Sequence, residues 1–215
     1  MSFTENNAKT LLLIAFGINL FFLLLCLVFG DLKFGAVDDY FMAAVLTGAH
    51  GTVYNPHLLF VNALYGYALL PLYHLFPKVG WYYVGEMFAV FAGFMTVCYV
   101  LLRCCGVRWG AVLSALFVAM FASDFYLVLQ FTQCASLLSA AGMLLFAYGV
   151  VNCKRSRAGD MVPLKNRLAG VAPVALGVAL LLWGSVMRWE AFLMGMPFFC
   201  AGLLFLLGCC WKARW

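Results

Sequence analysis

The chain has 215 residues, of which 67% are hydrophobic and 10% charged, with a mean hydropathy of +1.02 and a formal net charge of +5 at pH 7. One soluble core of this size cannot bury so many apolar side chains, so the composition excludes a soluble globular domain and predicts an integral membrane protein. The positive charge does not indicate nucleic-acid binding, because the basic residues form short clusters between apolar runs, where they orient helices.

The first apolar run covers residues 10–30. About 20 apolar residues cross a bilayer as a helix, whereas a signal peptide has an apolar region of only ~7–15 residues, so we expect a retained transmembrane helix. Five later runs meet or nearly meet this length, at 82–102, 110–128, 134–152, 170–187 and 191–211. Together they predict one all-α membrane domain over residues 1–215, a polytopic transmembrane bundle of about six to seven apolar helices.

Residues 31–81 separate the first two spans and are expected to carry short surface or half-embedded helices. Residues 40–49 are typical of a short helix lying at the lipid boundary. A further apolar run, 58–76, is interrupted by residues that suit a lipid-facing span poorly, namely Asn62, Gly66, Pro71 and His74. The sequence leaves open whether this run crosses the membrane or lies at its surface.

Basic residues accumulate on the cytoplasmic side of membrane proteins, so their distribution tests these alternatives. With the N-terminus inside and 58–76 not crossing, ten lie inside and three outside, the three being Lys33, Lys78 and Arg188. If 58–76 crosses and the N-terminus is inside, the numbers reverse to three basic residues inside and ten outside. Letting it cross with the N-terminus outside gives ten to three again, so charge alone leaves two topologies open.

Asp38 and Asp39 form an adjacent acidic pair just after the first apolar run. Neighbouring residues on a helix point about 100° apart, so we expect one of them to face a substrate, and their repulsion to raise the pKa of one. The alternative is an acidic loop that caps a helix end. His57, beside a proline in "YNPHLLF", is a further candidate ligand, or a simple turn residue.

Arg188 and Glu190 occupy a short turn, "MRWEAF", between the last two spans. A guanidinium group holds phosphate oxygens with two parallel hydrogen bonds, so Arg188 is a candidate phosphate partner; the alternative is an ion pair with Glu190 that closes the hairpin. Glu86 lies in an apolar run, where an ionised carboxylate costs roughly 2.5–3.5 kcal/mol if centred, and so should face protein or water. We treat Glu86 and Glu190 as candidate substrate-binding residues.

The nine cysteines show no ligand-like spacing and are expected to be reduced and structural. No metal-ligand cluster, phosphate-binding loop or dinucleotide motif is present in the sequence. We therefore predict no cofactor and no dedicated metal site, with a divalent cation left open.

The order of these features resembles the GT-C superfamily of polytopic membrane glycosyltransferases, which use polyprenyl-phosphate sugars. A first helix precedes "DDYFMAAVLTGAHG", then comes "NPHLLFVNALYGYALLPLYHLFP", and a helix ending in basic residues follows. The resemblance covers roughly residues 10–110, and the chain is similar to a short member or an N-terminal portion. In this chain the His-Pro order of the family is reversed, as "NPH" at 55–57.

The resemblance implies transfer of a sugar from a polyprenyl-phosphate donor to an envelope glycan or lipid acceptor, with inversion at the sugar carbon. It implies Asp38 or Asp39 as catalytic base, and His57 and Arg188 as substrate-binding residues. It also implies a plasma (inner) membrane protein with a cytoplasmic N-terminus and an outer acidic loop. The alternative is a non-enzymatic membrane protein, such as a small transporter, a flippase-like lipid handler or an envelope-complex subunit, in which Glu86 and Asp124 would line a transport path.

Overall fold

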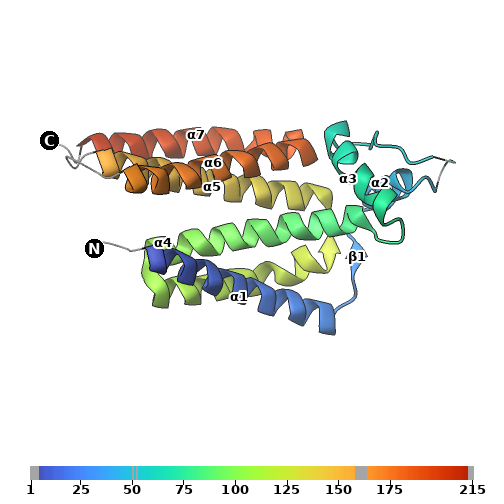
Figure 1. Cartoon of the computed structure of the whole chain (residues 1–215), viewed down its shortest axis with the longest axis horizontal. Helices are drawn as coiled ribbons and strands as arrows, with labels where there is room; N and C mark the ends of the chain where they lie inside the picture. The colour runs from blue at the N-terminus through green and yellow to red at the C-terminus, as the bar shows by residue number, and fades with distance from the viewer. Residues whose placement is uncertain (1–4, 50, 52, 158–163, 213–215) are drawn as a thin grey trace.

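The computed structural model describes residues 5–49, 51, 53–157 and 164–212, and it is an all-α helical bundle (Figure 1), as predicted. Two strands of two residues each join the helices. In chain order the elements are α1 (Glu5–Phe29), β1 (Lys33–Phe34), α2 (Val37–Leu46), α3 (Ala63–Leu75), α4 (Trp81–Tyr126), β2 (Val128–Leu129), α5 (Phe131–Arg157), α6 (Leu164–Met187) and α7 (Trp189–Lys212).

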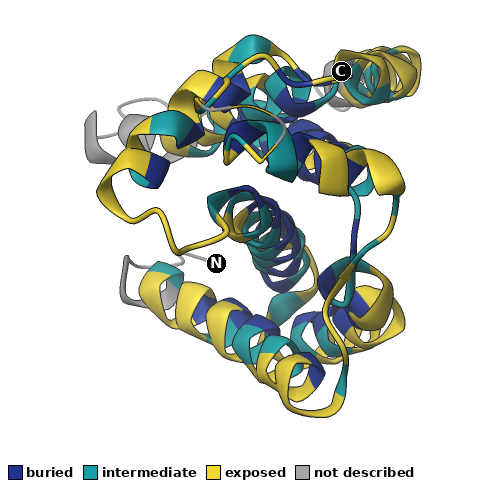
Figure 2. Cartoon of the chain, turned by 90° about the vertical axis from the view of Figure 1, so that its right-hand side faces the viewer, coloured by how far each residue is buried: buried dark blue, intermediate teal, exposed yellow. Residues whose placement is uncertain are grey.

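The bundle has the composition and surface of a membrane protein. Four segments within its helices are long and apolar enough to cross a bilayer, Ala8–Phe29, Trp81–Tyr126, Phe131–Cys153 and Trp189–Leu206, and Val171–Met187 is a shorter apolar helix. Large apolar side chains cover the outward faces, with Leu13 70%, Val28 72% and Phe198 82% exposed, and exposed ribbon lines the outside of the bundle in Figure 2. Soluble proteins rarely expose apolar surface on this scale, which fits a lipid environment.

Helix α4 is a hairpin of two antiparallel arms. Its helical backbone is broken at Gly106, where φ is 78° and ψ 170°, a region that only glycine adopts readily. The arms then run back along each other, so that Ser114 Oγ donates to the Cys98 carbonyl at 3.4 Å. The predicted runs 82–102 and 110–128 are therefore the two arms of one hairpin.

The bundle has two unlike ends (Figure 1). Both described chain ends and the Gly106 turn lie at one of them, which we call the terminal end. Helices α2 and α3, with the β strands, cover the opposite end, which we call the loop end. Helix α3 has 13 residues and is thus about 20 Å long, shorter than a hydrocarbon core of about 30 Å.

The β1–β2 pair fixes the loop end. The strands are parallel, with Lys33 opposite Val128 and Phe34 opposite Leu129. On either side of this short ladder, Lys33 N–H donates to the Leu127 carbonyl at 2.8 Å and Gly35 N–H to the Leu129 carbonyl at 2.6 Å. Because the strands run in the same direction, the helices that follow them, α2 and α5, begin side by side.

Two further contacts hold the spans together. The buried Asn19 of α1 donates from Nδ2 to the Phe91 carbonyl at 2.8 Å and accepts from the Tyr126 hydroxyl, which joins α1 to both arms of α4. Helices α5 and α6 approach so closely that a Cβ added at Gly177 would lie 2.7 Å from Phe146 N. Small residues at such crossings are the usual means of close helix packing in membranes.

Candidate functional site

The acidic pair stands in the first turn of α2, and its two carboxyl groups have different surroundings. Asp38 is exposed, whereas Asp39 has no exposed surface. This division follows from helix geometry, since adjacent side chains point about 100° apart and only one can face the bundle. We expected only one acid of the pair to be available to a substrate, and Asp38 is the exposed one.

Asp39 fastens α2 to the spanning helices. Its Oδ1 accepts the Phe131 N–H at 3.1 Å and the Tyr82 hydroxyl at 3.0 Å. Phe131 is the first residue of α5, and an N–H at that position has no acceptor within its own helix. The carboxylate thus caps α5 from another element, next to the positive end of the helix dipole.

Glu86 faces Asp39 from α4. It is fully buried, and its carboxyl group lies within hydrogen-bonding range of the Asp39 carboxyl. Burial raises the pKa of Asp39 above the ordinary value, and the hydrogen bonds from Phe131 and Tyr82 oppose this rise. Asp39 Oδ2 and both oxygens of Glu86 receive no hydrogen bond from the described residues.

Two tyrosines of α3 close this cluster. The Tyr73 hydroxyl accepts the Tyr82 N–H at 2.9 Å, which caps the start of α4 as Asp39 caps the start of α5. The Tyr65 hydroxyl approaches α4 at Gly85, where an added Cβ would lie 2.7 Å from its oxygen, and no described residue hydrogen-bonds to it. Burial raises the pKa of both tyrosines, so both remain neutral hydroxyl groups at neutral pH.

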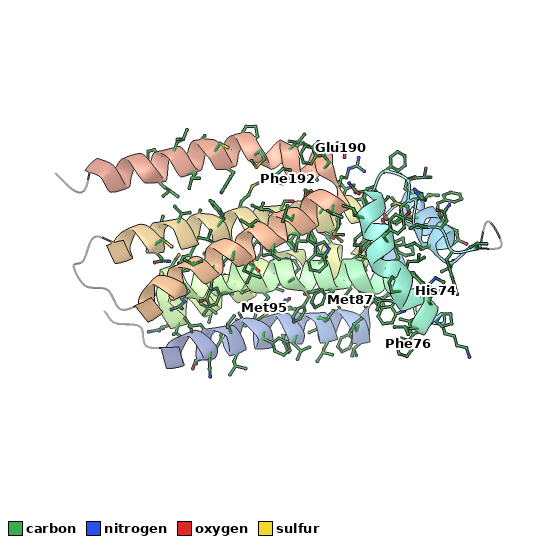
Figure 3. All side chains as sticks on the ribbon, turned by 45° about the horizontal axis from the view of Figure 1, so that its top comes forward. His74, Phe76, Met87, Met95, Glu190 and Phe192 are labelled. Atoms are coloured by element: carbon green, nitrogen blue, oxygen red, sulfur yellow. The ribbon has the colours of Figure 1, made fainter. Side chains whose placement is uncertain are left out.

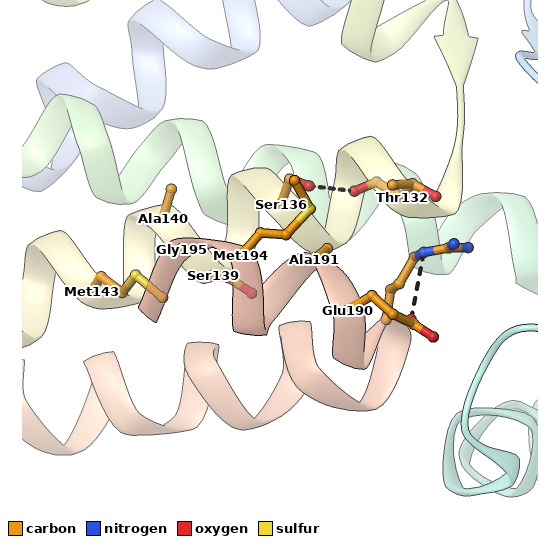
Figure 4. Close-up of a pocket in the computed structure, with 10 residues that line it drawn as sticks. Thr132, Ser136, Ser139, Ala140, Met143, Glu190, Ala191, Met194 and Gly195 are labelled. Atoms are coloured by element: carbon orange, nitrogen blue, oxygen red, sulfur yellow. Dashed lines mark hydrogen bonds and ion pairs between the residues drawn. The ribbon is translucent and has the colours of Figure 1, made fainter. Parts of the chain in front are cut away.

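A groove of about 400 Å³ lies between α5 and α7 (Figure 4). Arg188 and Glu190 stand at the loop end of this groove, and Met143 lies deeper along it. Its lining residues are Thr132, Ser136, Ser139, Ala140, Met143, Arg188, Glu190, Ala191, Met194 and Gly195. A polar, charged entrance above an apolar interior suits an amphiphile.

Arg188 connects the groove with the acidic cluster. Its guanidinium carbon lies 4.8 Å from the centroid of the Phe131 ring, while the Phe131 N–H is bound by Asp39. Its Nε lies 3.6 Å from Glu190 Oε2, so the predicted ion pair of the hairpin is present, but it is long and leaves most of the guanidinium hydrogen-bond donors available. Such a pair at a surface contributes little stability.

The remaining predicted residues lie apart from the groove. His57 is exposed, with its Nδ1 3.1 Å from Asn55 Oδ1 and its ring edge-on to Tyr67. Figure 3 places His74 at the loop end, away from Glu190. Asp124 is exposed, two residues before the end of α4. Asp38 and Glu86 do not line the groove either.

Metal ligands and cysteines add no further centre in the part of the chain that the structure describes. There, no group of three or more His, Cys, Asp or Glu side chains is placed to hold a metal ion. The described cysteines form no disulfide; Cys26, Cys98 and Cys134 are buried, and Cys104, Cys105 and Cys200 exposed.

The sequence interpretation missed the tyrosines of the cluster. The apolar run 82–102 begins with Tyr82, whose hydroxyl points inward to Asp39. A signal was available, because Tyr82 and Glu86 are four residues apart and so share one face of a helix. Asn19 was equally overlooked, although a lone amide in an apolar run needs a buried partner.

Comparisons with known proteins give no further guide: no family model, no curated protein and no solved structure matches the chain.

Replacing Asp39 should destabilise the fold, whereas the same change at Asp38 should not. Asp39→Ala leaves the Phe131 N–H without an acceptor and the Tyr82 hydroxyl with only a weak one, Met42 Sδ at 3.9 Å, and an unsatisfied buried group costs about 1–3 kcal/mol. For a chain of this size we expect the apparent unfolding temperature in detergent to fall by about 5–10 °C. Asp38→Ala, the matched control, should change it by no more than about 2 °C. Equal effects of the two variants would contradict the assignment of Asp39 as the anchoring residue.

Proposed function

We propose that the chain is a membrane glycosyltransferase of the GT-C type, which transfers a sugar from a polyprenyl-phosphate donor to an envelope glycan or lipid acceptor. The observation that supports this proposal is that the exposed Asp38 and the α5–α7 groove stand at the same end of the bundle: Asp39, the neighbour of Asp38, accepts the Phe131 N–H, and Arg188 at the groove lies over the Phe131 ring. An accessible acid and a cation beside an apolar groove are what transfer from a lipid-linked sugar requires.

In the proposed reaction Asp38 is the general base. The acceptor hydroxyl attacks the anomeric carbon, its proton passes to the Asp38 carboxylate, and the bond from that carbon to the phosphate oxygen breaks. The sugar is inverted, and the polyprenyl phosphate leaves with the bonding electron pair. Such proton transfer contributes typically 10²–10⁴-fold to a rate. Asp38 meets the requirement of exposure, which Asp39 does not.

Arg188 is proposed to hold the donor phosphate, with the lipid chain entering the groove below it. Only a quarter of its side chain is exposed (26%), against 69% for Glu190. A phosphate would therefore meet a partly desolvated guanidinium, which binds oxyanions more strongly than an exposed one. Charge on the departing phosphate would be stabilised in the same way. Glu190 stands beside it as a candidate acceptor-binding residue, and His57 as a more distant one.

The proposed orientation places the N-terminus in the cytoplasm and the loop end outside the plasma membrane. The elements at the terminal end carry the clusters rich in Arg and Lys, such as Arg103 and Arg108 beside the Gly106 turn. The short, transverse α3 supports a loop 31–81 that does not cross the bilayer. A lipid-linked sugar and its acceptor would then meet at the outer surface.

The arrangement of the acids argues against a transport path as the main function. Glu86 and Asp124 are near the two ends of α4, which the hairpin brings to the same end of the bundle. Asp124 is exposed there, and Glu86 is taken up by contact with Asp39. A row of ionisable groups through the membrane centre, as a transporter would use, is not formed by the described residues.

Asp38→Asn should lower sugar transfer by roughly 10²-fold or more, because it keeps the size and polarity of the side chain but removes the base. The assay supplies membranes with polyprenyl-phosphate sugars and measures transfer per amount of folded protein. Asp31→Asn, a second exposed acid of the same loop, serves as control and should stay within threefold of the parent. Undiminished transfer by Asp38→Asn would end the assignment of a catalytic base to this loop.

Arg188→Lys should weaken donor use at least tenfold at limiting donor, because a lysine keeps the charge but cannot make two parallel hydrogen bonds to a phosphate. Titrating the donor separates this loss of binding from a loss of kcat. Arg108→Lys at the terminal end is the matched control. An unchanged donor titration would reassign Arg188 to its local pair with Glu190.

Cysteine labelling in intact cells tests the orientation. Val53 and Val107 are 74% and 51% exposed and lie at the loop end and the terminal end respectively. In a cysteine-free background, an impermeant thiol reagent should label Val53→Cys directly and Val107→Cys only after permeabilisation. The reverse pattern would place the acidic loop in the cytoplasm, where the proposed lipid-linked sugar chemistry has no place.

A further inference from the structure

Asp39 and Glu86 are two carboxyl groups in contact, and their protonation state is a property separate from the proposed transfer reaction. Both side chains have no exposed surface. Of their four carboxyl oxygens, only Asp39 Oδ1 receives hydrogen bonds from the described residues; Asp39 Oδ2, Glu86 Oε1 and Glu86 Oε2 receive none. Two carboxyl groups within hydrogen-bonding range of each other can share a hydrogen bond only if one of them carries a proton.

The groups that the structure describes around this pair supply no positive charge. They are Asp38 on α2, Tyr65 and Tyr73 on α3, Tyr82 and Tyr83 on α4, and Cys134 on α5. Arg188 lies beside Glu190 and over the face of Phe131, and no ion pair among the described residues reaches either buried carboxyl. Two adjacent buried negative charges without a counterion are strongly unfavourable.

The two acids are not equivalent, which decides where a proton would reside. Asp39 has two hydrogen-bond donors and the start of α5 to stabilise its negative charge. Glu86 has neither. We infer that Glu86 is held in its protonated form and donates a hydrogen bond to Asp39 Oδ2, so that the pair binds one proton and carries a single negative charge.

An independent feature of the site supports this assignment. The Tyr65 hydroxyl is also buried and without a partner, and it lies against α4 at the residue before Glu86. With one Glu86 oxygen protonated and bound to Asp39, the other Glu86 oxygen is a carbonyl that can accept a hydrogen bond from a hydroxyl group. One proton thus gives Asp39 Oδ2 a donor and leaves Glu86 an acceptor oxygen in a cluster with two unpartnered buried hydroxyl groups, those of Tyr65 and Tyr83.

The bound proton couples acidity to the attachment of α2. In the unfolded chain both carboxyl groups ionise near pH 4, whereas the folded chain retains one proton above that pH. The folded state then binds more protons than the unfolded state, so stability must fall as pH rises from about 4 through neutrality. Because Asp39 holds α2 against α5, loss of the proton should loosen the helix that presents Asp38.

The test compares the full-length parent with Glu86→Gln in detergent between pH 5 and pH 9. Glutamine is nearly isosteric with the protonated acid and donates to Asp39 at every pH. The parent's apparent unfolding temperature should fall across this range, whereas Glu86→Gln should show at most half of that fall and be the more stable of the two at pH 9. Asp38→Asn, which removes an exposed neighbouring acid, should retain the slope of the parent. An unchanged slope in Glu86→Gln would overturn the inference.

Two further measurements exclude the other means of neutralising the pair. Infrared spectra should contain the carbonyl stretch of a buried protonated carboxylic acid in the parent, and this band should be absent from Glu86→Gln; its absence from the parent would refute a bound proton even if the variant failed to fold. A divalent cation would instead make stability fall with a chelator and recover with added Mg²⁺ or Ca²⁺. Such a response in the parent, lost in Glu86→Gln, would replace the proton by a metal ion.

Discussion

The hydrogen bond from the Phe131 N–H to Asp39 is the contact on which the loop end of the bundle depends. It joins a surface helix to the first turn of a spanning helix and satisfies a backbone donor that α5 cannot satisfy itself. Around this bond the Tyr82 hydroxyl, Glu86 and the α3 tyrosines form a buried layer between the membrane spans and the exposed loop. The ring of the same Phe131 supports Arg188, so one residue holds the acidic cluster and the cationic end of the groove in a fixed relation.

Much of the fold could be predicted because spanning helices are nearly specified by composition and length. The runs at 82–102 and 110–128, for example, needed only the apolar pattern and the intervening basic residues. Their joining into one hairpin at Gly106 is local as well, since a glycine with positive φ is compatible with a sharp reversal. The pattern of apolar helices therefore predicts most of the architecture without any knowledge of tertiary contacts.

The candidate site could be predicted only in part, because its contacts join residues far apart in the chain. The sequence marks Asp38 and Asp39 as a pair but does not say which side faces inward; that depends on the pairing of β1 with β2, two segments too short to be recognised from any periodic pattern. The partnership of Asp39 with Tyr82 and Phe131 spans 43 and 92 residues. Arg188 and Glu190, by contrast, belong to one turn, and their proximity follows from chain geometry.

The two hydrogen bonds of the Asn19 side chain affect how the membrane domain is assembled. As the chain is made from its N-terminus, α1 exists before either of its partners, Phe91 and Tyr126, has been synthesised. During that interval neither of these two partners is available to the amide, and insertion is favoured by the apolar character of the helix, whose mean hydropathy is 2.9 with Asn19 included. Arrival of the α4 hairpin then supplies both partners at once. Asn19 thereby gives this apolar helix one preferred depth and one preferred rotation against the hairpin. Apolar contacts alone would leave many depths and rotations of α1 with nearly equal energy.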